Sequence, residues 1–189
     1  GDVVVSAEGN VPVLTADPVK KSRTFYTGVE KEEKAQRTYA YDYLGLAVEM
    51  TTVYGYSGDD LDWSMELVGE KLTASPGDVI EAFTKYDRSE EQSMLYTYRF
   101  LGNTLLAEDI LSFDESDIVN STVYSYSGGY MDWAMTLTGK EESAETGDII
   151  ESYIKYDGTE DQRMLYTYSF EGDTALGVDI EVFADPSVI

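Results

Sequence analysis

Apolar and polar residues alternate along most of the chain, and the alternation falls in two long stretches that match each other. Residues 52–113 and 122–183 align without a gap at a constant offset (122 − 52 = 70), and about half of their positions are identical. In the first stretch the apolar side chains of Trp63, Met65 and Leu67 occupy every second position. This period places them on one face of an extended strand. The pattern therefore predicts β-strands within an internal duplication.

Each repeat divides into five extended segments, which in the first repeat cover 51–57, 62–72, 78–87, 92–101 and 103–113. The connections are short and contain Gly, Asp, Ser or Asn, which favours antiparallel hairpins over helical crossovers. One segment is ambiguous, because Ser75 and Pro76 resemble a helix start ahead of apolar residues at helical spacing. Its counterpart in the second repeat alternates like a strand, so we expect a strand over 75–87.

Two shorter regions precede the repeats. Residues 1–19 contain two β-branched runs, Val3–Val5 and Val11–Leu14. Pro12 cannot donate to a ladder, so the second run is expected at a sheet edge or beside a bulge. The first run is either an ordinary strand of the domain or a strand that pairs with a neighbouring subunit.

Residues 20–50 are expected to form a hairpin that imitates the third and fourth segments of a repeat. The similarity lies in Tyr39, Tyr41 and Tyr43, which have the spacing of the alternating aromatic residues of the repeat. This region is either a truncated third copy or the same strand pattern without common origin.

About a dozen strands follow from this count, which suits an all-β, antiparallel β-sandwich or a barrel-like fold. We expect three regions, 1–50, 51–120 and 121–189. The stretch 114–121 that joins the repeats is too short and too apolar to be a free linker. A single copy of this size without a disulfide is marginal alone, so the repeats are expected to share one compact body.

The net charge of the chain limits the classes of partner that it can bind. With 37 acidic and 13 basic residues the net charge is −24, while 42% of the residues are hydrophobic, as in a globular protein. Nucleic acid is excluded as a partner because phosphate contacts need a basic surface. The absence of Cys and His removes disulfides, thiolates and every Ser-His or Cys-His nucleophile. No apolar run is long enough to span a membrane.

Acidic turns are the candidate cation sites, because Ca²⁺ takes carboxylate and carbonyl oxygens from tight loops. The candidates are Asp59, Asp60 and Asp62 in one turn, Asp87, Glu90 and Glu91 in a second, Asp114, Glu115 and Asp117 between the repeats, and Asp157, Thr159, Glu160 and Asp161 in the last. None fits the twelve-residue helix–loop–helix calcium motif. The alternative for each is an ordinary solvated turn.

The 16 tyrosines and two tryptophans suggest either core packing or binding of a partner. Those in step with Met and Phe on the strands, including both tryptophans, are predicted to be core. The tyrosines around the Ser-Gly turns are predicted to be exposed and to contact a sugar or a protein. These are Tyr54, Tyr56, Tyr124, Tyr126 and Tyr130.

Two further features of the sequence bear on function. A pair of carboxylates could support glycoside hydrolysis without histidine, but no particular pair stands out among so many acids. Asn120-Ser121-Thr122 is an N-glycosylation sequon between the repeats.

The sequence thus favours a non-catalytic, extracellular or cell-surface protein that assembles with itself into a surface layer, fibre or adhesive. We expect calcium to stabilise it and Val3, Val4 and Val5 to contact a neighbouring subunit by strand addition. The start at Gly1 suggests processing of an exported precursor. The alternatives are a carbohydrate-binding module and, third, a carboxylate-pair hydrolase.

Overall fold

The protein is all-β and antiparallel, as the sequence predicts. A computed structural model describes residues 20–29 and 33–177 in full and residues 3–5 and 12–14 by their backbone alone. The strands are β1 (Val3–Val5), β2 (Pro12–Leu14), β3 (Ser22–Thr27), β4 (Lys34–Tyr41), β5 (Val48–Ser57), β6 (Asp60–Val68), β7 (Ile80–Tyr86), β8 (Met94–Phe100), β9 (Ile118–Ser127), β10 (Tyr130–Thr138), β11 (Ile150–Tyr156) and β12 (Met164–Ser169). A short 3₁₀ turn, η1 (Glu115–Asp117), precedes β9.

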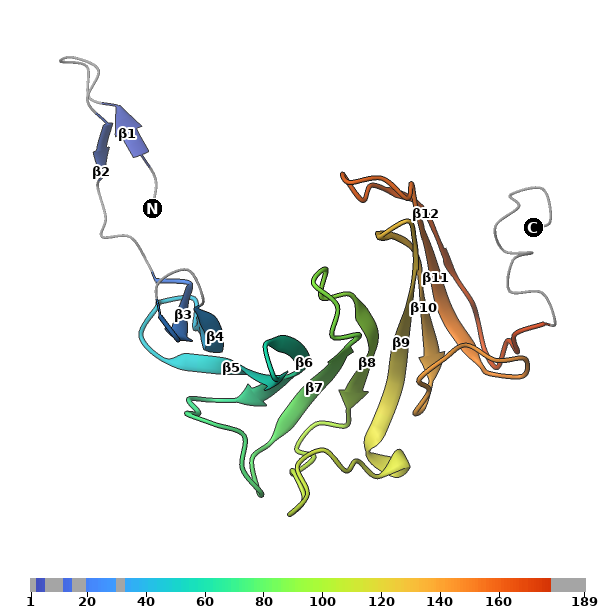
Figure 1. The fold of residues 1–189 in the computed structure, drawn as a ribbon, viewed down its shortest axis with the longest axis horizontal. Coiled ribbons are helices and arrows are strands. Elements are labelled where there is room, and N and C mark those ends of the chain that lie inside the picture. The colour runs from blue at the N-terminus through green and yellow to red at the C-terminus, as the bar shows by residue number, and fades with distance from the viewer. Residues whose placement is uncertain (1–2, 6–11, 15–19, 30–32, 178–189) are drawn as a thin grey trace.

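Ten of these strands form one sheet in which every strand pairs with its neighbours in sequence, from β3 at one edge to β12 at the other. The sheet is strongly curved, so that β3–β5 and β10–β12 rise on opposite sides of the molecule (Figure 1). This curvature is consistent with the barrel-like alternative, although β3 and β12 are not paired with each other. β1 and β2 form a separate two-stranded sheet.

The two repeats have the same strands in the same register. Trp63 of β6 pairs with Lys85 of β7, and their counterparts Trp133 and Lys155 pair in the same way in the second repeat. β8 pairs with β9, so the sheet runs from one repeat into the next without a break.

A β-bulge interrupts each of the nine strand pairs of the large sheet. Asp62 is one of the extra residues, because Trp63 pairs with Gly55 and Leu61 with Tyr56. Bulges bend a strand and increase its twist. One bulge in every pair therefore accounts for the curvature of the sheet.

The hairpin of β3 and β4 repeats the geometry of β7 and β8. Arg23 pairs with Tyr39 as Phe83 pairs with Tyr98, and the bulge lies beside Tyr26 as it lies beside Tyr86. The expected hairpin is present, but Tyr39 matches Tyr98 and not Tyr96. The sequence alignment was displaced by two residues because a shift of two leaves the alternation unchanged.

The strand expected at 103–113 is not formed. Apart from one bridge between Val79 and Leu105, this stretch is a loop. Its apolar residues pack onto the sheet, and Leu106 is buried in the core. The segment predicted as ambiguous, 75–87, contains strand β7 and no helix.

The apolar face of the sheet forms two core clusters, one in each repeat, with Met65 and Leu67 fully buried in the first and Met135 and Leu137 in the second. Tyr98 is also buried, as expected for a core strand, whereas Tyr96 is half-buried and packs against both clusters. A sheet must cover its apolar face. The long loops do this here.

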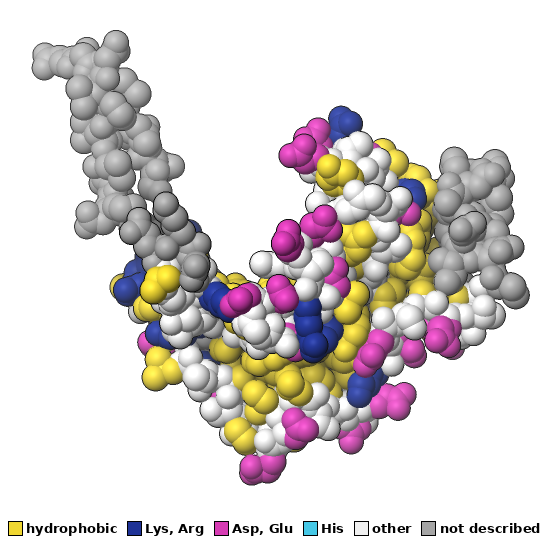
Figure 2. All heavy atoms as spheres, viewed as in Figure 1, with side chains coloured by type: hydrophobic (Ala, Val, Ile, Leu, Met, Phe, Trp, Pro, Cys, Tyr) yellow, Lys and Arg dark blue, Asp and Glu magenta, His cyan; other side chains and the backbone are white. Residues whose placement is uncertain are grey.

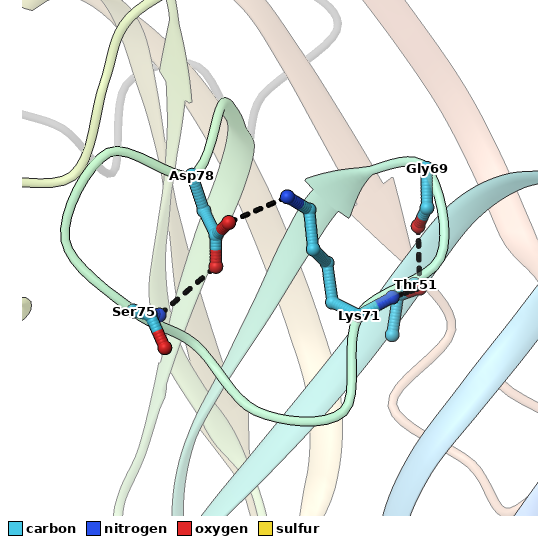
Figure 3. Close-up of polar contacts among 5 residues, drawn as sticks. All are labelled: Thr51, Gly69, Lys71, Ser75 and Asp78. Carbon is cyan, nitrogen blue, oxygen red and sulfur yellow. Dashed lines mark hydrogen bonds and ion pairs between the residues drawn. The ribbon is translucent and has the colours of Figure 1, made fainter.

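The β6–β7 loop and the corresponding β10–β11 loop are each anchored by a buried hydroxyl, that of Thr51 on β5 and that of Ser121 on β9 (Figure 3 shows the first). Thr51 Oγ1 donates to Gly69 O at 2.6 Å and accepts from Lys71 N–H at 3.1 Å, and Lys71 Nζ lies 2.5 Å from Asp78 Oδ1. Ser121 makes the same two hydroxyl bonds in the second repeat, but Glu141 replaces the lysine.

The pKa of Glu141 is therefore raised, by burial first and then by the charge of Asp148. We expect Glu141→Lys to stabilise the protein by about 0.5 kcal/mol, the range of a partly exposed ion pair. Because its folded-state pKa is raised, Glu141 destabilises the fold increasingly as pH rises above its ordinary value of 4.5. The gain, measured by urea denaturation, should be larger at pH 7 than at pH 4; an equal gain at both would contradict the electrostatic explanation.

Gly55 and Ser125 provide a second matched test. A Cβ on Gly55 would lie 2.0 Å from Trp63 Cε2, so the indole covers the glycine. Gly55→Ala should cost about 1–3 kcal/mol through displacement of this ring. The control Ser125→Ala, at the equivalent position facing Trp133, should be nearly neutral because a Cβ is already present there. Equal denaturation midpoints for the two variants would contradict this packing.

Candidate functional site

The face of the sheet opposite the core carries a row of tyrosines, one on each odd-numbered strand from β3 to β11. Its members are Tyr26, Tyr56, Tyr86, Tyr126 and Tyr156, and we call this set the tyrosine row. Each is paired with a small or aliphatic residue on the following or preceding strand, such as Leu61 with Tyr56 and Met94 with Tyr86. Each also lies next to a bulge.

The rings in the middle of this face lean over the preceding strand. Tyr56 Oη donates to Ala35 O at 3.1 Å, and Met94 N–H donates to Tyr126 Oη at 3.1 Å. Tyr86 Oη lies 3.3 Å from Ser64 Oγ. Because each hydroxyl is held at a neighbouring strand, the ring lies across the sheet instead of standing upright.

Burial raises the pKa of Tyr56, Tyr86 and Tyr126, so these hydroxyls remain protonated and uncharged at neutral pH. Tyr54 and Tyr124 extend the same surface, with hydroxyls 3.3 Å from Thr38 Oγ1 and Thr97 Oγ1. Neighbouring threonines are hydrogen-bonded to one another, as Thr84 is to Thr97 at 3.0 Å.

The structure thus brings together four of the five tyrosines that the sequence singled out, while Tyr130 is the first residue of β10, with 38% of its surface exposed. Tyr26, Tyr86 and Tyr156 were missed. The sequence does contain a signal for them, because each is a tyrosine at the last or next-to-last position of a strand with the same alternating pattern. The side chains of Val3, Val4 and Val5 lie outside the described residues.

The acidic turn residues mostly stabilise the turns themselves. Asp87 accepts from the backbone N–H and hydroxyl of Ser89, and Asp114 does the same with Ser116 as the N-cap of η1. The pKa of Asp114 is lowered chiefly by the Ser116 N–H.

In the last turn Asp157 accepts from Thr159 and from Arg163, whose Nε lies 2.9 Å away. Burial acts to raise the pKa of Asp157, but these bonds lower it overall. Of the remaining candidates, Asp59 pairs with Lys34 at 2.7 Å. Glu90, Glu91 and Asp161 are surface residues of the turns, Asp60 is the exposed first residue of β6, and Asp117 is the last residue of η1.

Figure 2 shows acidic side chains mainly at the turns and loop ends. Among residues 20–29 and 33–177, no three Asp or Glu side chains converge as a metal site requires. Calcium binding therefore remains a prediction that rests on composition and turn sequence.

Asp62, at the bulge of β6, forms ion pairs with two cations. Its Oδ1 lies 2.6 Å from both Lys85 Nζ and Arg88 Nε, and only 13% of its side chain is exposed. The hydrogen bond from Arg88 is the main cause of its lowered pKa. Asp132 has only Lys155, at 2.6 Å, because Gly158 replaces the arginine.

A cavity of about 150 Å³ lies at the junction of the repeats, against Trp63, Lys85 and Tyr96. Glu142 is the one carboxylate in its lining and accepts a 3.1 Å hydrogen bond from Tyr98 Oη.

Among residues 20–29 and 33–177, β12 is an edge strand with β11 as its one partner. Phe170 N–H donates to Glu151 O of β11, so alternate residues on β12 direct their N–H groups the same way, and Thr167 and Ser169 direct theirs outward. In the first repeat, the corresponding strand β8 is paired on this side with β9. Leu101 N–H extends this pairing by donating to Asp117 O. The sequon residue Asn120 is not in a loop, because it lies within β9 and its Nδ2 donates to Glu151.

The ion pairs of Asp62 with Lys85 and Arg88 give a testable difference between the repeats. Asp62→Asn should cost about 1–2 kcal/mol, because it leaves Lys85 half-buried without its ion pair. Asp132→Asn should cost about half as much, since only one cation is lost there.

The folded-state pKa of Asp62 is lowered, so its stabilisation is present above its ordinary value of 3.8 and is lost as pH falls through the folded-state value. Denaturation curves at pH 7 and about pH 2 should show the Asp62→Asn penalty at the first pH alone. A penalty that persists in acid would point to packing instead of charge.

Within the described residues no helix is long and apolar enough to cross a membrane. No protein-family model, no curated protein and no solved structure matches the chain.

Proposed function

We propose that this chain is a non-catalytic structural subunit that assembles head to tail by strand addition, with β12 as the acceptor edge and the N-terminal hairpin of the next copy as the donor. The main support for the proposal is that the strands of the large sheet repeat in groups of four, and that β3 and β4 correspond to the third and fourth strands of such a group. Added strands gain main-chain hydrogen bonds and a defined register at once.

The sheet follows a four-strand cycle, β5–β8 and then β9–β12, and β3–β4 match the third and fourth strands of that cycle. The first and second positions before β3 are empty in the large sheet. β1 and β2 immediately precede β3 in the chain and, within the part of the chain that the structure describes, pair with each other and with no other strand. Two strands are thus available for two open positions.

In the proposed assembly, β1 pairs with β12 of the preceding copy and β2 pairs with β3 of its own chain. Every contact remains antiparallel and every strand neighbours the next one in sequence, as in the rest of the sheet. The acceptor edge is suited to this because the N–H groups of Thr167 and Ser169 point away from β11.

The distribution of charged residues along the chain supports the same head-to-tail direction of assembly. Residues 20–41, next to the N-terminal hairpin, contain six basic and three acidic residues, whereas residues 121–177 contain three basic and eleven acidic residues. The guanidinium groups of Arg23 and Arg37 lie 4.5 and 4.1 Å from the Phe25 ring centroid, at the β3 edge. Opposite charges at the two ends favour head-to-tail association over the pairing of like ends.

The proposal also includes an extracellular or cell-surface location, where calcium is abundant enough to screen a net charge of −24. Cations would reduce repulsion between copies, whether or not any single turn coordinates an ion.

Deletion of residues 1–17 and the edge variant Thr167→Pro should each abolish assembly and leave the fold intact. Proline removes an outward donor of β12 without removing a hydrogen bond to β11. Light scattering of the wild type should show large particles with calcium and smaller ones with chelator, and Thr167→Val should assemble normally. Monomeric wild-type protein under both conditions, or normal assembly of either disabling variant, would refute strand addition.

A further inference from the structure

The tyrosine row provides a binding surface that does not depend on self-assembly. We propose that it binds an extended, uncharged polysaccharide that lies across the strands of the large sheet. The argument rests on the orientation of the rings, on their periodicity and on the charge of the surface.

The rings are pre-organised for stacking. The hydroxyls of Tyr56, Tyr86 and Tyr126 are each held at the preceding strand, so one ring face is directed away from the sheet. The axial C–H groups of a pyranose carry partial positive charge and stack on the electron-rich face of an aromatic ring. Because the rings are fixed before binding, little side-chain entropy is lost.

The row is periodic in one direction. Its members occur on alternate strands of a continuous antiparallel sheet, so neighbouring rings are about 9.5 Å apart, which is twice the strand spacing. Residues between them are small or aliphatic, as Leu61 and Met131 are, and both are buried. A linear polymer whose units repeat along an extended chain can meet several such rings, whereas a single sugar meets one.

The surface selects against charged polymers. The residues that pair with the row tyrosines, such as Leu61 and Met131, carry no charge. The hydroxyls of Tyr54, Tyr124 and the adjacent threonines supply neutral hydrogen-bonding groups. A cation borders the row at Tyr56, where Lys34 Nζ lies 5.3 Å from the ring centroid. A net charge of −24 repels polyanions such as uronic-acid polymers. A neutral polysaccharide is therefore the ligand class that fits.

Affinity electrophoresis of the whole chain tests this, with hydroxyethyl cellulose, xyloglucan, laminarin and polygalacturonate in separate gels. We expect retardation by at least one neutral polymer and none by polygalacturonate. Tyr126→Ala should weaken that binding about tenfold, which is the effect of losing one stacked ring. Tyr126→Phe keeps the ring and should weaken it less.

Tyr43→Ala is the matched control, because Tyr43 is 80% exposed in the β4–β5 turn and lies outside the row. It should bind like the wild type. If Tyr126→Ala lowers the thermal midpoint, Tyr26→Ala is the second variant, since Tyr26 lies at the β3 edge with 62% of its surface exposed and should lose affinity without losing stability.

Three results would overturn the proposal: no retardation of the wild type by any neutral polymer, stronger retardation by polygalacturonate, or equal losses for Tyr43→Ala and Tyr26→Ala. The loss of assembly in the strand-addition variants has no bearing on it, because monomers retain the row.

Discussion

The β-bulge is the constraint on which the rest of this structure depends. Near one end of the strand pairs, the extra residue lies on even-numbered strands, as Asp62 does on β6 and Asp132 on β10. Near the other end it lies on odd-numbered strands, as Glu81 does on β7 and Glu151 on β11. Bulges that alternate in this way bend the sheet continuously.

The same bulges distribute side chains between the two faces. Leu61 and Trp63 are two residues apart, yet they lie on opposite faces because Asp62 is inserted between them. Trp63 then joins the core and Leu61 supports the tyrosine row. Asp62 is placed beside Lys85, which pairs with Trp63, and this explains why an ion pair forms next to an apolar cluster.

A single sheet has two faces, and this protein treats them differently. Loops with buried apolar residues such as Leu106 and Leu176 cover one face, which excludes water from the core clusters. The other face is filled by hydrogen-bonded threonines and by tyrosines that lie across it. The protein thus combines a buried core with neutral hydroxyl groups along the tyrosine row, while its acidic residues occupy the turns and several strand positions, among them the bulge residues Asp62 and Asp132.

The sequence by itself determined the strands, their antiparallel order and the positions of the core residues Met65, Leu67 and Tyr98, because period-two alternation is a local property of the chain. It also placed Tyr54, Tyr56, Tyr124 and Tyr126 outside the core. Only the tertiary structure decided the rest. A shift of two residues leaves the alternation unchanged, so the correct alignment of Tyr39 could not be read from it. The pairing of neighbouring strands, which no single strand pattern specifies, gathers the distant tyrosines into one row. The stretch 103–113 alternates like a strand, but β8 pairs directly with β9, so the stretch does not enter the sheet between them. Its apolar residues cover the core instead.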